Sequence, residues 1–377
     1  MIKFCPVCSG KSFKDIFLLN KINKYNLNYF DKLKEAVNAS TVKVHFVECK
    51  KCEFLFNKSY IQLDYKIDYN ANRSYSKIFD NYLNEVVNYL EKFIIKKHKI
   101  ENILEIGFGD AEFIKKLPKI KNNKFIKILG FDPSSNISNS KPVKGVELIK
   151  DYYTTKVPFQ PDLLILRHTL EHISNVTSFL KKILHKKPKF IFIEVPCKSF
   201  VYKDNIHYFS NEHCSYFDDY SLQILLKKFG YKKVNIKKVF NGENILSIFI
   251  KTKKEINIKK KISRISSKFS LEEFQKKLHK KIDLSNDFFW GASGKGVMLF
   301  NLLGISYKKC RFVLDINKEI QGKFLGLSGI KIISPNDLTI YINEKSKIFI
   351  MNVLYKKEIE KILKKMKIKN KVYNLFN

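Results

Sequence analysis

The segment NILEIGFGDAEF (residues 102–113) constrains the fold of this chain more than any other. Its apolar start predicts a buried strand, which ends in the pattern Glu105-x-Gly107-x-Gly109-x-Ala111 before a helix begins. Glycines at these positions permit a tight turn and let a ligand approach the backbone closely. The segment therefore predicts a strand–turn–helix unit with a ligand at the carboxyl end of its strand.

Strands and helices alternate after this unit. The sequence predicts strands at 127–133, 163–168 and 189–196, and helices at 112–117 and 175–184. Because crossover helices join parallel strands in this order, the alternation indicates an open α/β sheet.

Three further features flank the alternating set. A helix with apolar residues at helical spacing is predicted at 79–98, and another at 221–229. Two strand candidates, 234–240 and 245–252, are joined by Asn-Gly-Glu-Asn, which is typical of a hairpin.

The chain is predicted to form three domains, since 377 residues exceed the usual size of one. Residues 1–62 hold two cysteine pairs, and residues 63–255 hold the alternating set. Residues 256–377 contain a second, shorter α/β alternation that follows a Lys- and Ser-rich stretch at 251–270. The predicted fold class is α/β, with a Rossmann-like core, a smaller Rossmann-like C-terminal domain and an N-terminal metal module.

The cysteine pairs predict a structural zinc site. Cys5-x2-Cys8 and Cys49-x2-Cys52 each suit a tight turn that presents two thiolates to one ion, and two such turns complete a tetrahedral site. The gap between the pairs is long for a zinc ribbon, and a helical insertion at 28–38 is expected to fill it.

The acidic residues near the glycine turn separate two classes of cofactor. A dinucleotide site requires an unobstructed helix N-terminus for pyrophosphate. S-adenosylmethionine has no phosphate and carries an ammonium and a sulfonium, which suits Glu105 at the strand end. Asp132, at the end of the next strand, is placed to accept hydrogen bonds from ribose hydroxyls.

The E-x-G-x-G pattern resembles motif I of the class I S-adenosylmethionine-dependent methyltransferases, with Ala111 where glycine is common. The resemblance implies that Gly107 and Gly109 approach the cofactor and that Asp132 binds its ribose. It also places Asp151 and Tyr152 beside the adenine and Arg167 beside the methionine moiety.

The whole chain resembles the zinc-containing sugar C-methyltransferases of deoxysugar biosynthesis. Three segments carry this likeness: residues 209–217 (FSNEHCSYF), similar to the family's Y-x-E-H-x-x-x-F, residues 170–173 (LEHI) and residues 69–74 (YNANRS). The resemblance implies a nucleotide-linked 4-keto sugar as acceptor, held in part by the C-terminal domain.

Carbon methylation beside a ketone needs a base that removes a proton. His213 is the candidate base, because histidine has a pKa near neutrality. Glu212 is placed to orient it or hold a sugar hydroxyl, and Tyr69 and His172 to stabilise enolate charge. The family's tyrosine two positions before the glutamate is Ser210 here, which leaves O-methylation of a sugar hydroxyl or glycan as an alternative.

The C-terminal domain contains a second glycine-rich turn, Gly291-Ala-Ser-Gly294-Lys295-Gly296, and Asp315 ends the strand that follows. The turn precedes an apolar helix, where backbone N–H groups favour anions. Gly294 and Lys295 are therefore predicted to bind the phosphate of the substrate. A turn that only packs helix against strand is the alternative.

The net charge of +35 raises the question of a nucleic-acid partner. The cations are nearly all lysine and spread along the chain, whereas bidentate recognition of phosphates and guanines favours arginine. A small-molecule partner is therefore preferred, with an RNA or protein methyltransferase and a non-catalytic binding protein as alternatives. No apolar run approaches the about 20 residues that span a bilayer, so a soluble cytoplasmic protein is expected.

Overall fold

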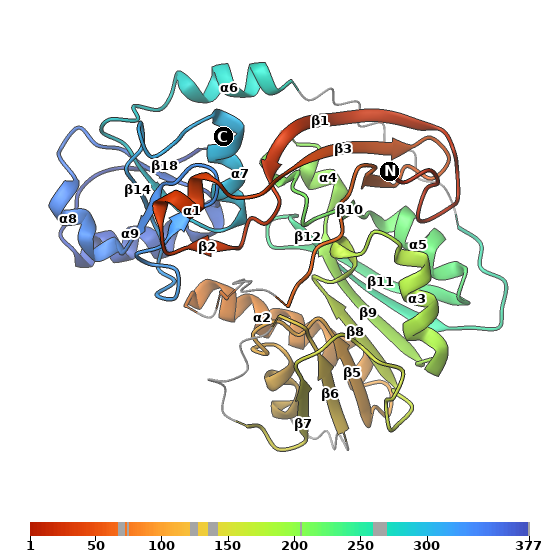
Figure 1. The fold of residues 1–377 in the computed structure, drawn as a ribbon. Helices are drawn as coiled ribbons and strands as arrows, with labels where there is room; N and C mark the ends of the chain where they lie inside the picture. Colours follow the sequence, from red (N-terminus) through yellow and green to blue (C-terminus); the bar gives the residue numbers. More distant parts are fainter. Residues whose placement is uncertain are drawn as a thin grey trace.

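The computed structural model describes residues 1–66, 72–73, 75–120, 127–134, 142–203, 206–258 and 270–375. Three sheets organise these residues, and Figure 1 shows the central sheet below an N-terminal sheet and a C-terminal one. Among the described helices, none is both long and apolar enough to cross a bilayer.

The central sheet has seven strands, and only one of them runs opposite to the rest. Their order is β11 (Tyr231–Val239), β12 (Asn244–Lys251), β9 (Phe190–Pro196), β8 (Leu163–Arg167), β5 (Asn102–Ile106), β6 (Lys127–Phe131) and β7 (Val146–Ile149). The reversed strand is β12, which pairs antiparallel with both β9 and β11. The predicted parallel alternation and the closing hairpin are confirmed.

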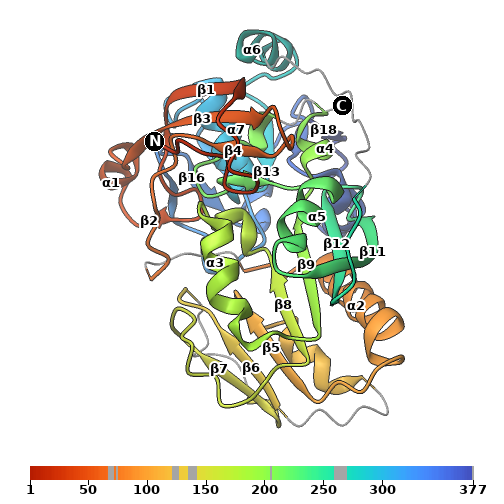
Figure 2. The same ribbon diagram turned by 90° about the vertical axis from the view of Figure 1, so that its right-hand side faces the viewer.

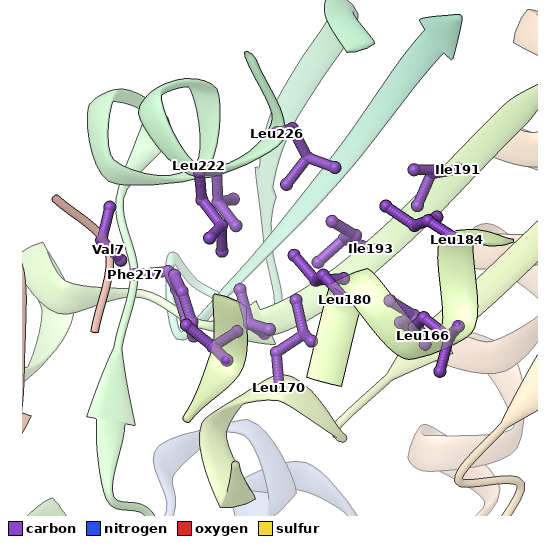
Figure 3. Packing of buried hydrophobic residues seen from close by; sticks show 14 of the residues in the cluster. Val7, Leu166, Leu170, Leu180, Leu184, Ile191, Ile193, Phe217, Leu222 and Leu226 are labelled. Carbon is purple, nitrogen blue, oxygen red and sulfur yellow. The ribbon is translucent and has the colours of Figure 1, made fainter. Parts of the chain in front are cut away.

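Helices cover both faces of this sheet because its strands are apolar on both sides. On β8, Leu164 and Leu166 belong to one core cluster, and Leu163 and Ile165 to the other. Helices α3 (Val176–Ile183) and α5 (Asp219–Lys227) pack on the first face, where Figure 3 shows their leucines meeting β9. Helix α2 (Lys77–Leu90) packs on the second.

Two predicted helices differ in form from the expectation. The helix after the glycine turn is a 3₁₀ helix, η2 (Ile114–Lys119), and Pro118 lies inside it. Proline removes a backbone donor and clashes with the preceding turn, which prevents a regular α-helix there. The long helix predicted at 79–98 begins at the cap Ser76 and changes at Glu91 into a short π-helix, η1 (Glu91–Ile95).

The N-terminal sheet has the order β1 (Phe13–Asn23), β3 (Thr41–Cys49), β4 (Leu55–Asn57) and β10 (Ser215–Tyr216). The helical insertion expected at 28–38 is present only as a five-residue helix, so it does not fill the gap between the cysteine pairs. Long strands fill it, with only β2 (Tyr29–Phe30) and the short helix α1 (Leu33–Val37) between them. On β3 the buried side chains Val42, Val44 and Phe46 follow the period of two of a strand.

The C-terminal sheet has the order β18 (Val372–Asn374), β17 (Ile348–Ile350), β13 (Phe288–Trp290), β14 (Phe312–Leu314), β16 (Lys331–Ile333), β15 (Phe324–Leu325) and β2. Helix α7 (Gly294–Leu303) follows β13. The N-terminal segment thus gives β2 to this sheet, while its own sheet receives β10 from the central part of the chain. Figure 2 shows the N-terminal strands β1, β3 and β4 close to α7.

Candidate active site

A cavity of about 1490 Å³ opens at the carboxyl ends of β5, β6 and β8. Its wall includes Gly109 and Asp132 of the core, Asn26 and Tyr29 of the N-terminal segment, and Gly294 of the C-terminal part. In the central sheet the strand order reverses between β5 and β8, and open α/β sheets bind ligands at such a switch point.

The glycines after β5 have different structural roles. Gly107 (φ 82°) leaves no room for a side chain, because an added Cβ would lie 2.2 Å from Thr169 Oγ1. Gly109 (φ 58°) faces no protein atom within 4 Å of such a Cβ. Gly107 therefore allows close packing, whereas Gly109 leaves the backbone open to a ligand.

Asp132 holds this turn in place. Its Oδ2 accepts a hydrogen bond from Gly109 N (2.8 Å), and its Oδ1 accepts from Ser134 N (2.8 Å) and Ser134 Oγ (2.7 Å). A carboxylate has about four acceptor positions, so one remains for a hydroxyl from the cavity.

Glu105 and Arg167 are buried behind the turn. Burial raises the pKa of Glu105 to about 8 against the effect of Arg167, and neither carboxylate oxygen has a partner among the described residues. Arg167 lines the cavity, donates from Nε to Glu194 Oε2 (2.6 Å) and lies over the Phe113 ring. Its Nη2 has no described partner, so Arg167 keeps a donor for a ligand, whereas Glu105 lies behind the cavity wall and is not part of it.

The two residues predicted beside the adenine differ in position. Tyr152 lines the cavity, and its hydroxyl donates to Asp64 Oδ1 (3.2 Å) and accepts from Tyr65 N (3.2 Å). Asp151 is exposed, pairs with Lys66 (2.9 Å) and is not part of the cavity wall.

His172 and His213 form a pair in the same cavity, with ring centroids 5.0 Å apart. His172 Nδ1 lies 2.9 Å from the carbonyl oxygen of Glu212 and 2.9 Å from Tyr65 Oη. A carbonyl oxygen only accepts, so Nδ1 carries the hydrogen and Nε2 the lone pair. One potential metal-ligand atom from each of Glu171, His172 and His213 lies within 4.8 Å of the other two.

Burial, with further contributions from His172 and nearby cations, lowers the pKa of His213 well below its usual value. The imidazole is therefore neutral at pH 7, the form that accepts a proton. The backbone N–H of His213 donates to Ser210 Oγ (3.2 Å).

Glu212 does not orient His213 in this structure. Its Oε1 accepts hydrogen bonds from the backbone N–H groups of Asn26 (2.7 Å) and Leu27 (3.2 Å). Burial raises the pKa of Glu212 to about 7. The glutamate thus connects the loop that carries His213 to the N-terminal segment.

Tyr69, a predicted member of the site, lies outside the described residues. Tyr65 was not predicted, although it lines the cavity and its ring contacts His172 edge-on. The tyrosine-rich stretch ahead of α2 was the available signal, but the sequence did not indicate which ring meets the histidine.

Sequence reasoning also missed a buried charge network below the histidine pair. His168 lies between two carboxylates, with Nδ1 3.1 Å from Glu171 Oε1 and Nε2 3.0 Å from Glu194 Oε1. Burial opposes the charged imidazole, but the two glutamates outweigh it and raise the pKa of His168 to about 9. Tyr82 and Asn244 also donate to Glu194.

This network makes stability depend on pH. Because the pKa of His168 is raised on folding, its contribution is fully present below pH 6.5 and is lost as pH rises through about 9. Thermal unfolding of wild type and His168→Gln should differ most below pH 6.5 and converge towards pH 10. A difference that stays constant between pH 6 and 10 would contradict a charged His168.

The C-terminal part of the wall contains the predicted phosphate site, Gly294 and Lys295, together with two carboxylates. Lys295 Nζ donates to Glu243 Oε1 (2.7 Å) and lies 4.6 Å from the centre of the Tyr208 ring. The lysine charge is thereby already neutralised. At the start of the same turn, Ala292 N donates to Asp315 Oδ2 (2.8 Å), so a carboxylate lies at the beginning of the turn.

The four N-terminal cysteines form one cluster. Sγ atoms of Cys5 and Cys52 lie 3.5 Å apart, as do those of Cys8 and Cys49, and all four lie within 4.8 Å of one another. Four thiolates at this spacing fit a tetrahedral zinc ion with no open position. The spacing of the two pairs was a sufficient signal in the sequence.

Comparisons with known proteins agree with this architecture. A family model described as a methyltransferase domain matches residues 72–236, and one described as a C-methyltransferase C-terminal domain matches residues 260–371. No curated protein matches the chain by sequence.

Solved methyltransferase structures are similar to about half of the chain at low identity. Magnesium protoporphyrin IX methyltransferase (ChlM) from Synechocystis PCC 6803, with bound SAH, is 10% identical with a TM-score of 0.37, covering 50% of this chain and 91% of that one. The N-methyltransferase NodS from Bradyrhizobium japonicum WM9 is 13% identical with a TM-score of 0.35, covering 46% of this chain and 98% of that one.

The strand order of the central sheet and the two family models together show the fold class and the domains of this chain. The central sheet, with its single reversed strand β12, is a class I methyltransferase core, and the matched C-terminal model covers the second α/β part. The protein is thus a methyltransferase, in which a methyltransferase domain is followed by a C-methyltransferase C-terminal domain.

Proposed function

We propose that this enzyme methylates a nucleotide-linked sugar at a carbon next to a keto group, with His213 as the base. The observation that carries the proposal is the single cavity of about 1490 Å³, whose wall joins the cofactor turn at Gly109 to the C-terminal turn at Gly294. One small ligand usually occupies about 300–1,000 Å³, so this cavity has room for a cofactor and a large acceptor together. The C-methyltransferase description of the C-terminal model supports carbon as the methylated atom.

The cofactor half suits S-adenosylmethionine, which supplies an electrophilic methyl group on a sulfonium. Asp132 is assigned to the ribose, because it lines the cavity and keeps an acceptor position. Arg167 Nη2 is assigned to the methionine carboxylate, and the carboxyl oxygens of Glu105, which have no partner among the described residues, are assigned to the ammonium, whose positive charge favours the ionised form of Glu105. The Glu105 oxygens and Arg167 Nη2 are buried and have no partner among the described residues, which fits a zwitterionic ligand.

The acceptor half suits proton removal from carbon. His213 takes a proton from the carbon next to the carbonyl, and the electrons of the broken C–H bond pass to the carbonyl oxygen as an enolate. The Tyr65 hydroxyl lines the cavity, and its oxygen lies 2.9 Å from His172 Nδ1, so it keeps its own hydrogen to donate to the enolate oxygen. The enolate carbon then bonds to the methyl group, and the electron pair of the broken C–S bond stays on sulfur.

Methyl transfer in deuterated water tests this assignment. The enzyme is incubated with S-adenosylmethionine and a panel of nucleotide-linked keto and hydroxy sugars, and the products are analysed by mass spectrometry. A gain of one methyl group on a keto sugar, with deuterium exchange beside the ketone, is expected. Methylation of a hydroxy sugar without exchange would instead establish O-methylation, with Ser210 in place of the family's tyrosine. No transfer to any sugar would overturn the proposal in favour of RNA or protein acceptors.

Asp132→Asn is expected to weaken S-adenosylhomocysteine binding about 10- to 100-fold, since hydrogen bonds to a charged group contribute about 1.5–3 kcal/mol each. Isothermal titration calorimetry measures the change. The matched control is Asp151→Asn, which removes an exposed carboxylate outside the cavity wall and should change affinity less than about threefold. Equal effects of the two substitutions would contradict the assignment of Asp132.

A further inference from the structure

The C-terminal turn repeats the geometry of the cofactor turn. In the core, Gly107 N donates to Phe131 O (2.8 Å), and the next residue, Asp132, accepts from the turn. In the C-terminal part, Gly291 N donates to Leu314 O (2.8 Å), and the next residue, Asp315, accepts from the turn. Both glycines have positive φ, 82° and 120°.

The two aspartates also share their second contact. Asp132 Oδ1 accepts from the backbone N–H two residues later, at 2.8 Å, and Asp315 Oδ1 does the same from Asn317 N at 2.9 Å. Each turn follows a strand at which the order of its sheet reverses, β5 in the central sheet and β13 in the C-terminal one. The chain therefore presents a similar strand–glycine turn–aspartate arrangement twice, although the N–H that meets the aspartate lies two residues after Gly107 and one residue after Gly291.

Two acceptors lie at the second turn, Asp315 and Asn26. Asn26 packs beside the turn, since a Cβ added to Gly294 would lie 3.7 Å from Asn26 Cβ. The Asn26 side chain is 2% exposed and lines the cavity, yet its Oδ1 has no partner among the described residues. Lys295, the nearby cation, is paired with Glu243. A ligand with hydroxyl donors satisfies these groups, whereas a phosphate placed against Asp315 would meet a second negative charge.

We propose that the C-terminal turn binds the ribose of the acceptor's nucleotide, with Asp315 accepting hydrogen bonds from the 2′- and 3′-hydroxyls. The natural acceptor is then carried on a ribonucleoside diphosphate rather than on a 2′-deoxyribonucleoside diphosphate. This assignment rests on the proposed function for the sugar part of the acceptor. It replaces the phosphate assigned to Gly294 and Lys295 with a cis-diol.

The wild-type enzyme provides the first test. Calorimetry with S-adenosylhomocysteine present compares UDP, GDP, CDP and ADP with their 2′-deoxy counterparts. At least one ribonucleotide is expected to bind about 10- to 100-fold more tightly than its deoxy form, since the missing hydroxyl leaves a buried carboxylate short of a donor. Equal affinities, or no binding of any nucleoside diphosphate, would overturn the inference.

Two substitutions test whether Asp315 is the residue that distinguishes ribose from 2′-deoxyribose. Asp315→Asn should abolish the preference for ribose and leave S-adenosylhomocysteine affinity unchanged. Asp132→Asn, the matched control at the other turn, should weaken S-adenosylhomocysteine binding and keep the ribose preference. A ribose preference that survives Asp315→Asn in a folded enzyme, or a second equivalent of S-adenosylhomocysteine bound at this turn, would also overturn it.

The outcomes separate this inference from the function beneath it. Methyl transfer to a deoxynucleotide-linked sugar together with equal nucleotide affinities leaves the proposed function standing and removes only the ribose assignment. Absence of methyl transfer together with tight, Asp315-dependent ribonucleotide binding leaves the ribose assignment standing and removes the proposed function.

Discussion

His213→Asn is expected to lower kcat about 10²- to 10⁴-fold, the usual contribution of a positioned general base. Asparagine keeps the size and polarity of the side chain but accepts no proton. Affinity for S-adenosylhomocysteine should remain unchanged, because the cofactor groups lie on other loops. His185→Asn, which changes an exposed histidine at the end of α3, is the matched control and should leave kcat unaltered.

Deuterium uptake from solvent and the pH dependence of kcat/KM distinguish a base from a residue with a purely structural role. Deuterium uptake beside the ketone should disappear in His213→Asn. The pKa of His213 is lowered by burial, so wild-type kcat/KM should stay level from pH 7 to 6.5 and fall only as pH drops through that lowered value. A kcat within threefold of wild type, or exchange that continues in the variant, would contradict His213 as the base.

Cys49→Ser is expected to remove one equivalent of zinc and to destabilise the protein by several kcal/mol, because binding of a structural zinc contributes directly to folding. Inductively coupled plasma mass spectrometry measures the metal, and thermal unfolding measures the stability. Cys310→Ala changes a buried cysteine of the C-terminal part and should keep the zinc.

Loss of the zinc cluster should also lower activity from a distance. Strand β10, next to His213, pairs with β4 of the N-terminal sheet, and Glu212 accepts two backbone N–H groups from the N-terminal segment. The loop carrying His213 therefore depends on that segment, whereas the hydrogen bonds described for Asp132 come from Gly109 and Ser134 of the core. A fall in kcat with cofactor affinity retained is expected. Unchanged metal content, or a metal-free variant as stable as wild type, would contradict this role.

Much of this protein was predictable because the signals are local. The alternation of strands and helices follows from the spacing of apolar residues, and the turn at Gly107 and Gly109 follows from residues that tolerate positive φ. The spacing within the cysteine pairs that begin at Cys5 and Cys49 also predicts a metal site by itself. Each of these patterns requires only neighbours within a few residues.

The remaining features depend on contacts between distant segments. Glu212 meets Asn26 across 186 residues, and Lys295 meets Glu243 across 52, so neither role was visible in its own motif. The sequence by itself determined the α/β core, the cofactor turn and the cysteine cluster, because short-range geometry specifies them. Only the tertiary structure decided that Glu212 anchors a loop, that Glu243 neutralises Lys295 and that Asp315 repeats Asp132, because packing alone brings those groups within hydrogen-bonding distance.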